Sequence, residues 1–151
     1  MKITAQAEQK IEELLKELTL EEKVSLCHAN SKFYAGGVER LGIGELAMMD
    51  GMHGVRSETE RDAWTCLNRT EDRCTYLPTG TALAATFNPE LGYRFGCVLG
   101  AEARRREKDI ILGPGVNIIR TPLCGRNFEY MSEDPCLIEK MPPSLRAVPR
   151  R

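Results

Sequence analysis

Two short apolar segments separated by a helix start constrain the fold of this chain most strongly. The ranges 46–50 (Leu-Ala-Met-Met-Asp) and 109–113 (Asp-Ile-Ile-Leu-Gly) are largely apolar and lead into polar, glycine-containing sequence. Between them, 88–90 (Asn-Pro-Glu) is typical of a helix start, since Asn caps, Pro fits the first helical position and Glu favours the positive end of the helix dipole. This alternation predicts an α/β fold whose two strands are parallel and buried.

Further helices are expected on both sides of this unit. Apolar residues within 5–18 follow helical spacing, which predicts a first helix there. Thr19 and Glu22 then form the pattern of a capping box, which predicts a second short helix running to Leu26. At the other end of the chain, a third helix is expected to open at 132–135, where a proline stands near its first turn.

The central helix after Asn88 is expected to bury an apolar stripe and to end in a basic run. The arginines at 104–106 suit the negative end of the helix dipole, so we interpret them as a solvated helix terminus rather than a nucleic-acid patch. Between this helix and the first strand, 57–76 is polar and has no clear period, which predicts a long surface loop. The stripe is expected to consist of Leu91, Phe95, Val98 and Leu99.

Charge and composition argue against several classes of partner. The chain has 21 basic and 22 acidic residues, so its net charge of −1 gives no electrostatic reason to expect nucleic acid or an anionic membrane. Its first ten residues lack the apolar stretch of a signal peptide, and no apolar run approaches the roughly 18 residues of a membrane span. The expected compartment is the cytoplasm, and the six cysteines are expected as reduced thiols that mostly fill the core. Their spacing suits no metal site, and neither a metal nor a cofactor is expected.

Polar residues gather where the two predicted strands end. The first segment is 49–56 (Met-Asp-Gly-Met-His-Gly-Val-Arg), and the second runs from 113–117 (Gly-Pro-Gly-Val-Asn) to 125–130 (Gly-Arg-Asn-Phe-Glu-Tyr). Carboxylates accept paired hydrogen bonds from neighbouring sugar hydroxyls, arginines donate in a fixed fork, and Phe128 or Tyr130 could pack on a sugar ring. These residues alone predict a polar site at the strand ends, with surface salt bridges and turns as the open alternative.

Five blocks of sequence, in this order, closely resemble the N-terminal part of glycoside hydrolase family 3 in its β-glucosidase branch. The resemblance runs from about Ile11 to Met141. Its blocks are Thr-Leu-Glu-Glu-Lys at 19–23, Asp-Gly-x-His-Gly-Val-Arg at 50–56, Leu-Ala-Ala-Thr-Phe-Asn-Pro-Glu at 83–90, Leu-Gly-Pro-Gly-Val-Asn at 112–117, and Arg-Thr-Pro-Leu-Cys-Gly-Arg-Asn-Phe-Glu-Tyr-Met-Ser-Glu-Asp-Pro at 120–135.

The resemblance implies the first portion of a (β/α)8 barrel of the TIM type, with about two β/α units and leading helices. A complete barrel takes roughly 250 residues, whereas this chain has 151, so the barrel is expected to be incomplete. Residues 1–141 are then a partial family 3 barrel domain. Residues 142–151 form a tail rich in proline and arginine that departs from the family, as after a frameshift.

The family hydrolyses β-glycosides with retention through a covalent glycosyl-enzyme, and the resemblance implies roles for five residues here. Asp50 and Arg126 would bind the sugar in the cleaved subsite, and Arg56 would support or line that pocket. His53 and Glu129 are further candidates. The alternative for His53 is a turn residue hydrogen-bonded to backbone, and for Glu129 it is an internal salt bridge with a nearby arginine.

The chain also departs from the family pattern. Met52 stands where the family usually has proline, which is expected to loosen the loop that holds Asp50. Retaining hydrolysis needs two carboxylates roughly 5 Å apart. The family places its nucleophilic aspartate, preceded by a Lys-His pair, beyond the matched region and its acid/base glutamate in a second domain. No catalytic residue is therefore expected here, and Glu133 and Asp134 are expected to serve a helix N-terminus.

The sequence thus predicts a fragment of a retaining β-glucosidase-like enzyme that carries part of a sugar pocket and is inactive alone. Its substrate class would be β-glucosides or related β-glycosides. The alternative is a non-catalytic fragment that docks with a separate barrel remainder or binds sugar weakly. Because two strand-helix units cannot close a barrel, exposed strand edges and poor solubility are expected.

Overall fold

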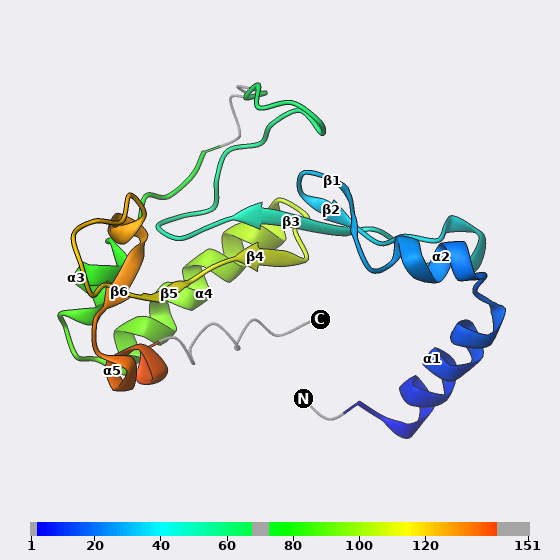
Figure 1. Cartoon of the computed structure of the whole chain (residues 1–151), viewed down its shortest axis with the longest axis horizontal. Helices are drawn as coiled ribbons and strands as arrows, with labels where there is room; N and C mark the ends of the chain where they lie inside the picture. Colours follow the sequence, from blue (N-terminus) through cyan, green and yellow to red (C-terminus); the bar gives the residue numbers. More distant parts are fainter. Residues whose placement is uncertain (1–2, 68–72, 142–151) are drawn as a thin grey trace. The chain divides into compact units, whose positions relative to one another are not determined.

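The computed structural model describes residues 3–67 and 73–141 (Figure 1). The segment 142–151, for which the sequence predicts a tail outside the family pattern, lies outside the described residues. By its internal contacts the chain divides into two compact units, Met1–Ala47 and Met48–Arg151.

The first unit begins with the two expected helices. Helix α1 spans Ala5–Glu17 and helix α2 spans Leu20–Ser25. The predicted capping box is present, because the Glu22 amide donates to the Thr19 hydroxyl at 3.2 Å and the Thr19 amide donates to the Glu22 carboxylate at 2.9 Å. Arg40 also binds the Glu22 carboxylate at 2.8 Å, and this hydrogen bond lowers the pKa of Glu22 below its ordinary value.

Short strands complete the first unit. Strand β1 (Ala29–Ser31) pairs antiparallel with β2 (Tyr34–Ala35), and β2 pairs antiparallel with the first two residues of β3 (Leu46–Asp50). A single 3-10 turn, η1, spans Glu39–Leu41. The buried apolar residues of this unit are Leu18, Phe33 and Val38.

The second unit contains the predicted pair of parallel strands. The last three residues of β3 pair with β4 (Ile110–Leu112), and the register places Met49 opposite Ile111 and Asp50 opposite Leu112. Between these strands lies helix α4 (Pro89–Arg105), whose Asn88 cap accepts a hydrogen bond from the Glu90 amide at 3.0 Å. The predicted strand-helix-strand order and the start of its helix are therefore confirmed.

The face that α4 buries differs from the predicted stripe. Phe95 and Leu99 are buried as expected, but Leu91 and Val98 are 39% and 40% exposed. The buried positions instead recur every three or four residues and include two glycines, which let the helix backbone approach the core closely. The helix is therefore turned so that Leu91 and Val98 lie at the margins of its buried face. They are Gly92, Phe95, Gly96, Leu99 and Ala103.

Four short elements of the second unit were not expected from the sequence. Helix α3 spans Gly80–Ala84, and strand β5 (Gly115–Ile118) pairs parallel with β6 (Tyr130–Ser132). The 3-10 turn η2 (Asn127–Glu129) leads directly into β6. The expected third helix is α5 (Pro135–Lys140), where the Asp134 carboxylate accepts from the Cys136 amide at 2.8 Å, so its predicted capping role is confirmed.

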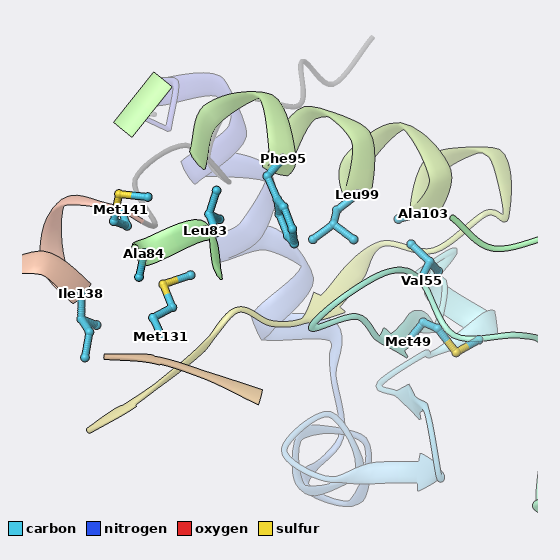
Figure 2. Close-up of a cluster of buried hydrophobic side chains, with 10 residues drawn as sticks. All are labelled: Met49, Val55, Leu83, Ala84, Phe95, Leu99, Ala103, Met131, Ile138 and Met141. Carbon is cyan, nitrogen blue, oxygen red and sulfur yellow. The ribbon is translucent and has the colours of Figure 1, made fainter. Parts of the chain in front are cut away.

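One continuous core joins these elements beneath α4 (Figure 2). Met49 and Val55 lie under the C-terminal half of the helix, near Leu99 and Ala103, while residues of α3, β6 and α5 gather toward its N-terminal half. Val55 is fully buried, so the loop that follows β3 is part of the core. The members are Met49, Val55, Leu83, Ala84, Phe95, Leu99, Ala103, Met131, Ile138 and Met141.

Two burial predictions are wrong. Only Met49 of β3 is buried, and Ile110 and Leu112 of β4 are each 39% exposed, because the described residues provide a covering helix on one face of these strands and close no barrel. The cysteines are not core fillers either. Cys97 and Cys124 are half-buried, and the other four are exposed. Among the described residues, no helix is both long and apolar enough to cross a membrane.

Candidate functional site

The loop after β3 holds Asp50 and Arg56 together. The Asp50 carbonyl accepts from the Arg56 amide at 3.0 Å, and the Arg56 guanidinium lies 3.5 Å from the Asp50 carboxylate. The Asp50 side chain is 50% exposed and that of Arg56 is 28% exposed, so the carboxylate can meet a ligand from solvent. The Arg56 guanidinium also lies 4.7 Å from the centre of the Trp64 ring, a cation–π geometry.

The backbone of this loop packs directly on the segment 73–77. Gly54 has φ +147°, and a Cβ atom there would lie 2.2 Å from the Thr75 carbonyl oxygen, so only glycine fits. The Leu77 amide donates to the His53 carbonyl at 2.6 Å. These contacts, with buried Val55, hold the loop; the expectation that Met52 loosens it stays a prediction.

The two loops together line an open groove of about 330 Å³. Its wall mixes a histidine and an arginine with a hydroxyl, a thiol and an aromatic ring, which is suited to a small polar ligand. The lining residues are His53, Gly54, Val55, Arg56, Ser57, Cys74, Thr75 and Tyr76.

His53 is the residue through which the two predicted segments meet. The centre of its ring lies 5.9 Å from the centre of the Tyr76 ring and 6.4 Å from that of the Phe128 ring, both in edge-on geometry. The Nε2 atom of His53 is buried and has no hydrogen-bond partner in the described part of the chain. The carbonyl of His53 is bonded to backbone, so the turn role proposed as the alternative is present, while sugar contact stays a prediction.

Arg126 and Glu129 form an ion pair within the second segment. The hydrogen bond from Arg126 to Glu129, with the charge of that carboxylate, raises the pKa of Arg126 above its ordinary value. The Arg126 side chain is 66% exposed, whereas that of Glu129 is 11% exposed, so the arginine is the more accessible partner. Glu129 therefore makes the salt bridge named as its alternative, and a sugar contact from it stays a prediction.

The first part of the second segment, 113–117, follows the end of β4 as predicted, while its later part, 125–130, leads into the start of β6. The turn η2 precedes β6, and Tyr130 at the start of β6 pairs with Gly115 at the start of β5. Because β5 begins three residues after β4 ends, this position still borders the end of β4. Asp50 and Arg126 share no hydrogen bond or ion pair in the described residues, and the His53–Phe128 contact links their segments instead.

Sequence analysis missed the aromatic residues Trp64 and Tyr76, the α4 residue Glu102 and the C-cap residue Arg106. Both aromatic residues lie in 57–76, where the sequence has no hydrophobic periodicity that could indicate their positions. The prediction of a solvated helix end is wrong for Arg106, since its guanidinium donates to the Arg56 carbonyl at 2.8 Å. Its place within a run of arginines gave no signal of that contact.

The site offers one exposed carboxylate and two arginines, a set that can bind neighbouring hydroxyl groups. Within residues 3–67 and 73–141 no cluster of three or more histidine, cysteine, aspartate or glutamate side chains could hold a metal ion. The exposed carboxylate and the two arginines favour recognition of hydroxyl groups.

Comparison with known proteins finds extensive similarity to glycosidases, although no family model matches the chain. The chain is 51% identical over 138 residues to β-glucosidase BoGH3A of Bacteroides ovatus, covering 91% of the chain and 18% of that protein. It is 41% identical over 123 residues to an exo-α-(1→6)-L-arabinopyranosidase of Bifidobacterium longum, covering 82% of the chain and 16% of that protein. The crystal structure of a GH3 β-glucosidase from Bifidobacterium adolescentis superposes with a TM-score of 0.73 at 37% identity, covering 87% of this chain and 18% of that one. The chain thus spans less than a fifth of the length of these relatives.

Proposed function

The chain is homologous over 91% of its length to a β-glucosidase of glycoside hydrolase family 3, and from this premise we propose that it supplies part of the sugar-binding wall of such an enzyme. In this proposal Asp50 and Arg126 bind hydroxyls of the sugar, and Arg56 orients the Asp50 carboxylate. The substrate class is a β-glucoside or a related β-glycoside. The similarity to an arabinopyranosidase indicates that the sugar preference depends on residues that vary among such proteins.

The observation that carries this proposal is the half-exposed Asp50 carboxylate beside the Arg56 guanidinium at the end of a parallel strand. Its position suits a (β/α)8 barrel, in which ligands bind at the C-terminal ends of the strands. We propose that β3, α4 and β4 form an early β/α unit of such a barrel. The exposed side chains of Ile110 and Leu112 are then surfaces that the rest of the barrel covers.

The chemistry itself is proposed to need carboxylates beyond these 151 residues. Retaining hydrolysis uses two carboxylates roughly 5 Å apart. Of the candidates here, Asp134 caps α5 and Glu129 is paired with Arg126. Neither is free to act as a nucleophile or a proton donor, so the isolated chain is expected to be inactive.

Titration of the 151-residue chain with glucose, followed by NMR, tests the sugar-binding proposal. Chemical-shift changes should concentrate at residues 50–57 and 126–129, and Asp50→Asn should weaken them. Asp134→Asn is a matched control, because it changes a carboxylate of similar size at the start of α5. Hydrolysis of an aryl β-glucoside should stay at the rate of the buffer blank. Absence of shifts at millimolar to molar glucose, or activity in the chain alone, would contradict the proposal.

A second candidate function is docking to a separately made barrel remainder, and one groove favours it. A groove of about 310 Å³ runs between α4 and β4, and its lining combines small and apolar residues with the charged residues Arg104, Lys108 and Asp109. Packed α/β domains bury such a surface under further elements. Co-expression with the part of the Bacteroides ovatus protein that follows the matched region tests this. A complex with Asp50-dependent β-glucosidase activity would support docking, and separate migration without activity would reject it.

A further inference from the structure

The last turn of α4 contacts the backbone of both loops that line the 330 Å³ groove. Glu102 lies in the last turn of α4, and Arg106 is the residue that caps its C-terminus. The Glu102 carboxylate accepts hydrogen bonds and the Arg106 guanidinium donates them. A single helix end therefore offers the two kinds of partner that free backbone carbonyls and amides need.

Arg106 bridges the two loops. Its Nη1 donates to the Arg56 carbonyl at 2.8 Å, and its Nη2 donates to the Arg73 carbonyl at 2.6 Å. Nη2 also lies 3.3 Å from the Cys74 sulfur. Arg105 donates to the same Arg73 carbonyl at 3.2 Å, so two arginines hold one point of the second loop.

Glu102 binds the second loop at Thr75, two residues after the Arg73 carbonyl that Arg106 binds. Its carboxylate accepts from the Thr75 amide at 3.3 Å and from the Thr75 hydroxyl. The Leu77 amide then donates to the His53 carbonyl, which returns the second loop to the first. Just beyond the helix, Lys108 forms a 3.0 Å ion pair with Glu58, and the Lys108 side chain is only 7% exposed.

We propose that Glu102 and Arg106 are positioning residues that set the spacing of the two groove loops and thereby the position of Arg56 beside Asp50. Hydrogen bonds to charged groups are among the stronger ones in proteins, and a planar guanidinium can bind two carbonyls in one fixed geometry. Neither residue lines the groove, so each acts through the backbone it holds. This inference deepens the proposed sugar-binding function and rests on it for its functional consequence.

Amide hydrogen exchange in the 151-residue chain tests the positioning role without any ligand. The reporters are the Arg56 amide, bonded to the Asp50 carbonyl, and the Leu77 amide, bonded to the His53 carbonyl, and Leu99 in α4 is the internal reference. Arg106→Gln should accelerate exchange at both reporters by at least about tenfold and leave Leu99 protected. Glu102→Gln should affect Leu77 more than Arg56. Arg106→Lys, which keeps the charge but loses the fork, should lie between Arg106→Gln and the unchanged chain.

Arg104→Gln is the matched control, because Arg104 belongs to the same run of arginines and makes none of these contacts. Unchanged exchange at both reporters in Arg106→Gln would overturn the proposal. Equal acceleration at Leu99 and the reporters, in Arg106→Gln and Arg106→Lys alike, would also overturn it, because the effect would then be global. Glucose titration of the same variants is read separately. If the unchanged chain binds no glucose, the sugar-binding function fails while the exchange result still decides the positioning role.

Discussion

The two segments of the candidate site are held in place in different ways. The loop that carries Asp50 and Arg56 is fixed by contacts distant in sequence, since Val55 is fully buried and Arg106 binds the Arg56 carbonyl. The segment that carries Arg126 is fixed by near neighbours. Asn127 donates to the Thr121 carbonyl at 2.7 Å, and Arg126 pairs with Glu129. The loop of Asp50 and Arg56 is thus part of the core, whereas the Arg126 and Phe128 side chains of the second segment are exposed.

This difference predicts in which segment a substitution can change ligand binding without changing the stability of the fold. Substitutions in the first loop are expected to change the free energy of unfolding and the site together. Substitutions in the second segment are expected to change the site with little effect on the fold.

The largest effect is expected at Gly54. Gly54→Ala should lower the free energy of unfolding by about 3 kcal/mol, because φ is +147° and the new Cβ would lie 2.2 Å from the Thr75 carbonyl oxygen. Gly125→Ala, in the second segment, should change it by less than about 0.5 kcal/mol, because nothing lies within 4 Å of its Cβ position. Urea denaturation followed by circular dichroism measures both. Equal stability of the two variants would contradict the expected difference between the first loop and the second segment.

A smaller loss is expected when Val55 is truncated. Val55→Ala should cost about 2 kcal/mol of unfolding free energy, since a fully buried side chain loses two methyl groups and leaves a cavity. The matched change in the second segment is Phe128→Ala, which removes a larger side chain that is 66% exposed and should cost less. The same denaturation experiment compares them, and a larger loss for Phe128→Ala would show that the second segment is also part of the core.

Within the second segment, Asn127→Ala should cost about 1 kcal/mol, the usual worth of one hydrogen bond. The loss should be local, because the Asn127 side chain donates to the Thr121 carbonyl only six residues away. Amide exchange should therefore accelerate within 121–129 and stay unchanged at Arg56. Accelerated exchange at Arg56 would mean that the two segments are coupled more tightly than these contacts indicate.

The smallest effect on stability is expected at Arg126. Arg126→Gln should change the urea midpoint by little, because the Arg126 side chain is 66% exposed and an ion pair with an exposed partner contributes little to folding. The same variant should weaken the chemical-shift response to glucose, since the guanidinium is the proposed donor to the sugar. Arg94→Gln is a control, because it breaks an ion pair on α4, with Glu90, in which both side chains are exposed. Unchanged glucose response in Arg126→Gln would reject the role of Arg126.

Helix starts were predictable because their chemistry is local. The capping box of Thr19 and Glu22 and the caps at Asn88 and Asp134 each involve residues two or three positions apart. Parallel pairing of 46–50 with 109–113 followed from the intervening helix, since such a connection joins parallel strands. These parts of the fold needed no knowledge of distant contacts.

Burial and the joining of the two segments could not be predicted in the same way. Whether Leu91 or Gly92 faces the core depends on which side of α4 meets the sheet, and both lie on one helix turn. Strands β5 and β6 are each no longer than four residues, too short for a periodic signal. The five candidate site residues came from resemblance, while the His53–Phe128 contact and the role of Arg106 depend on the three-dimensional path of the loops.

Arg106 holds its loops through main-chain oxygen atoms, and this has an evolutionary consequence. Every residue type carries a carbonyl, so the residues at positions 56 and 73 can be exchanged without removing the acceptors that the guanidinium binds. Side chains facing the groove are then open to mutation while the path of the loops is inherited unchanged. A scaffold of this kind allows descendants to diverge in the ligand they accept without first having to rebuild the fold.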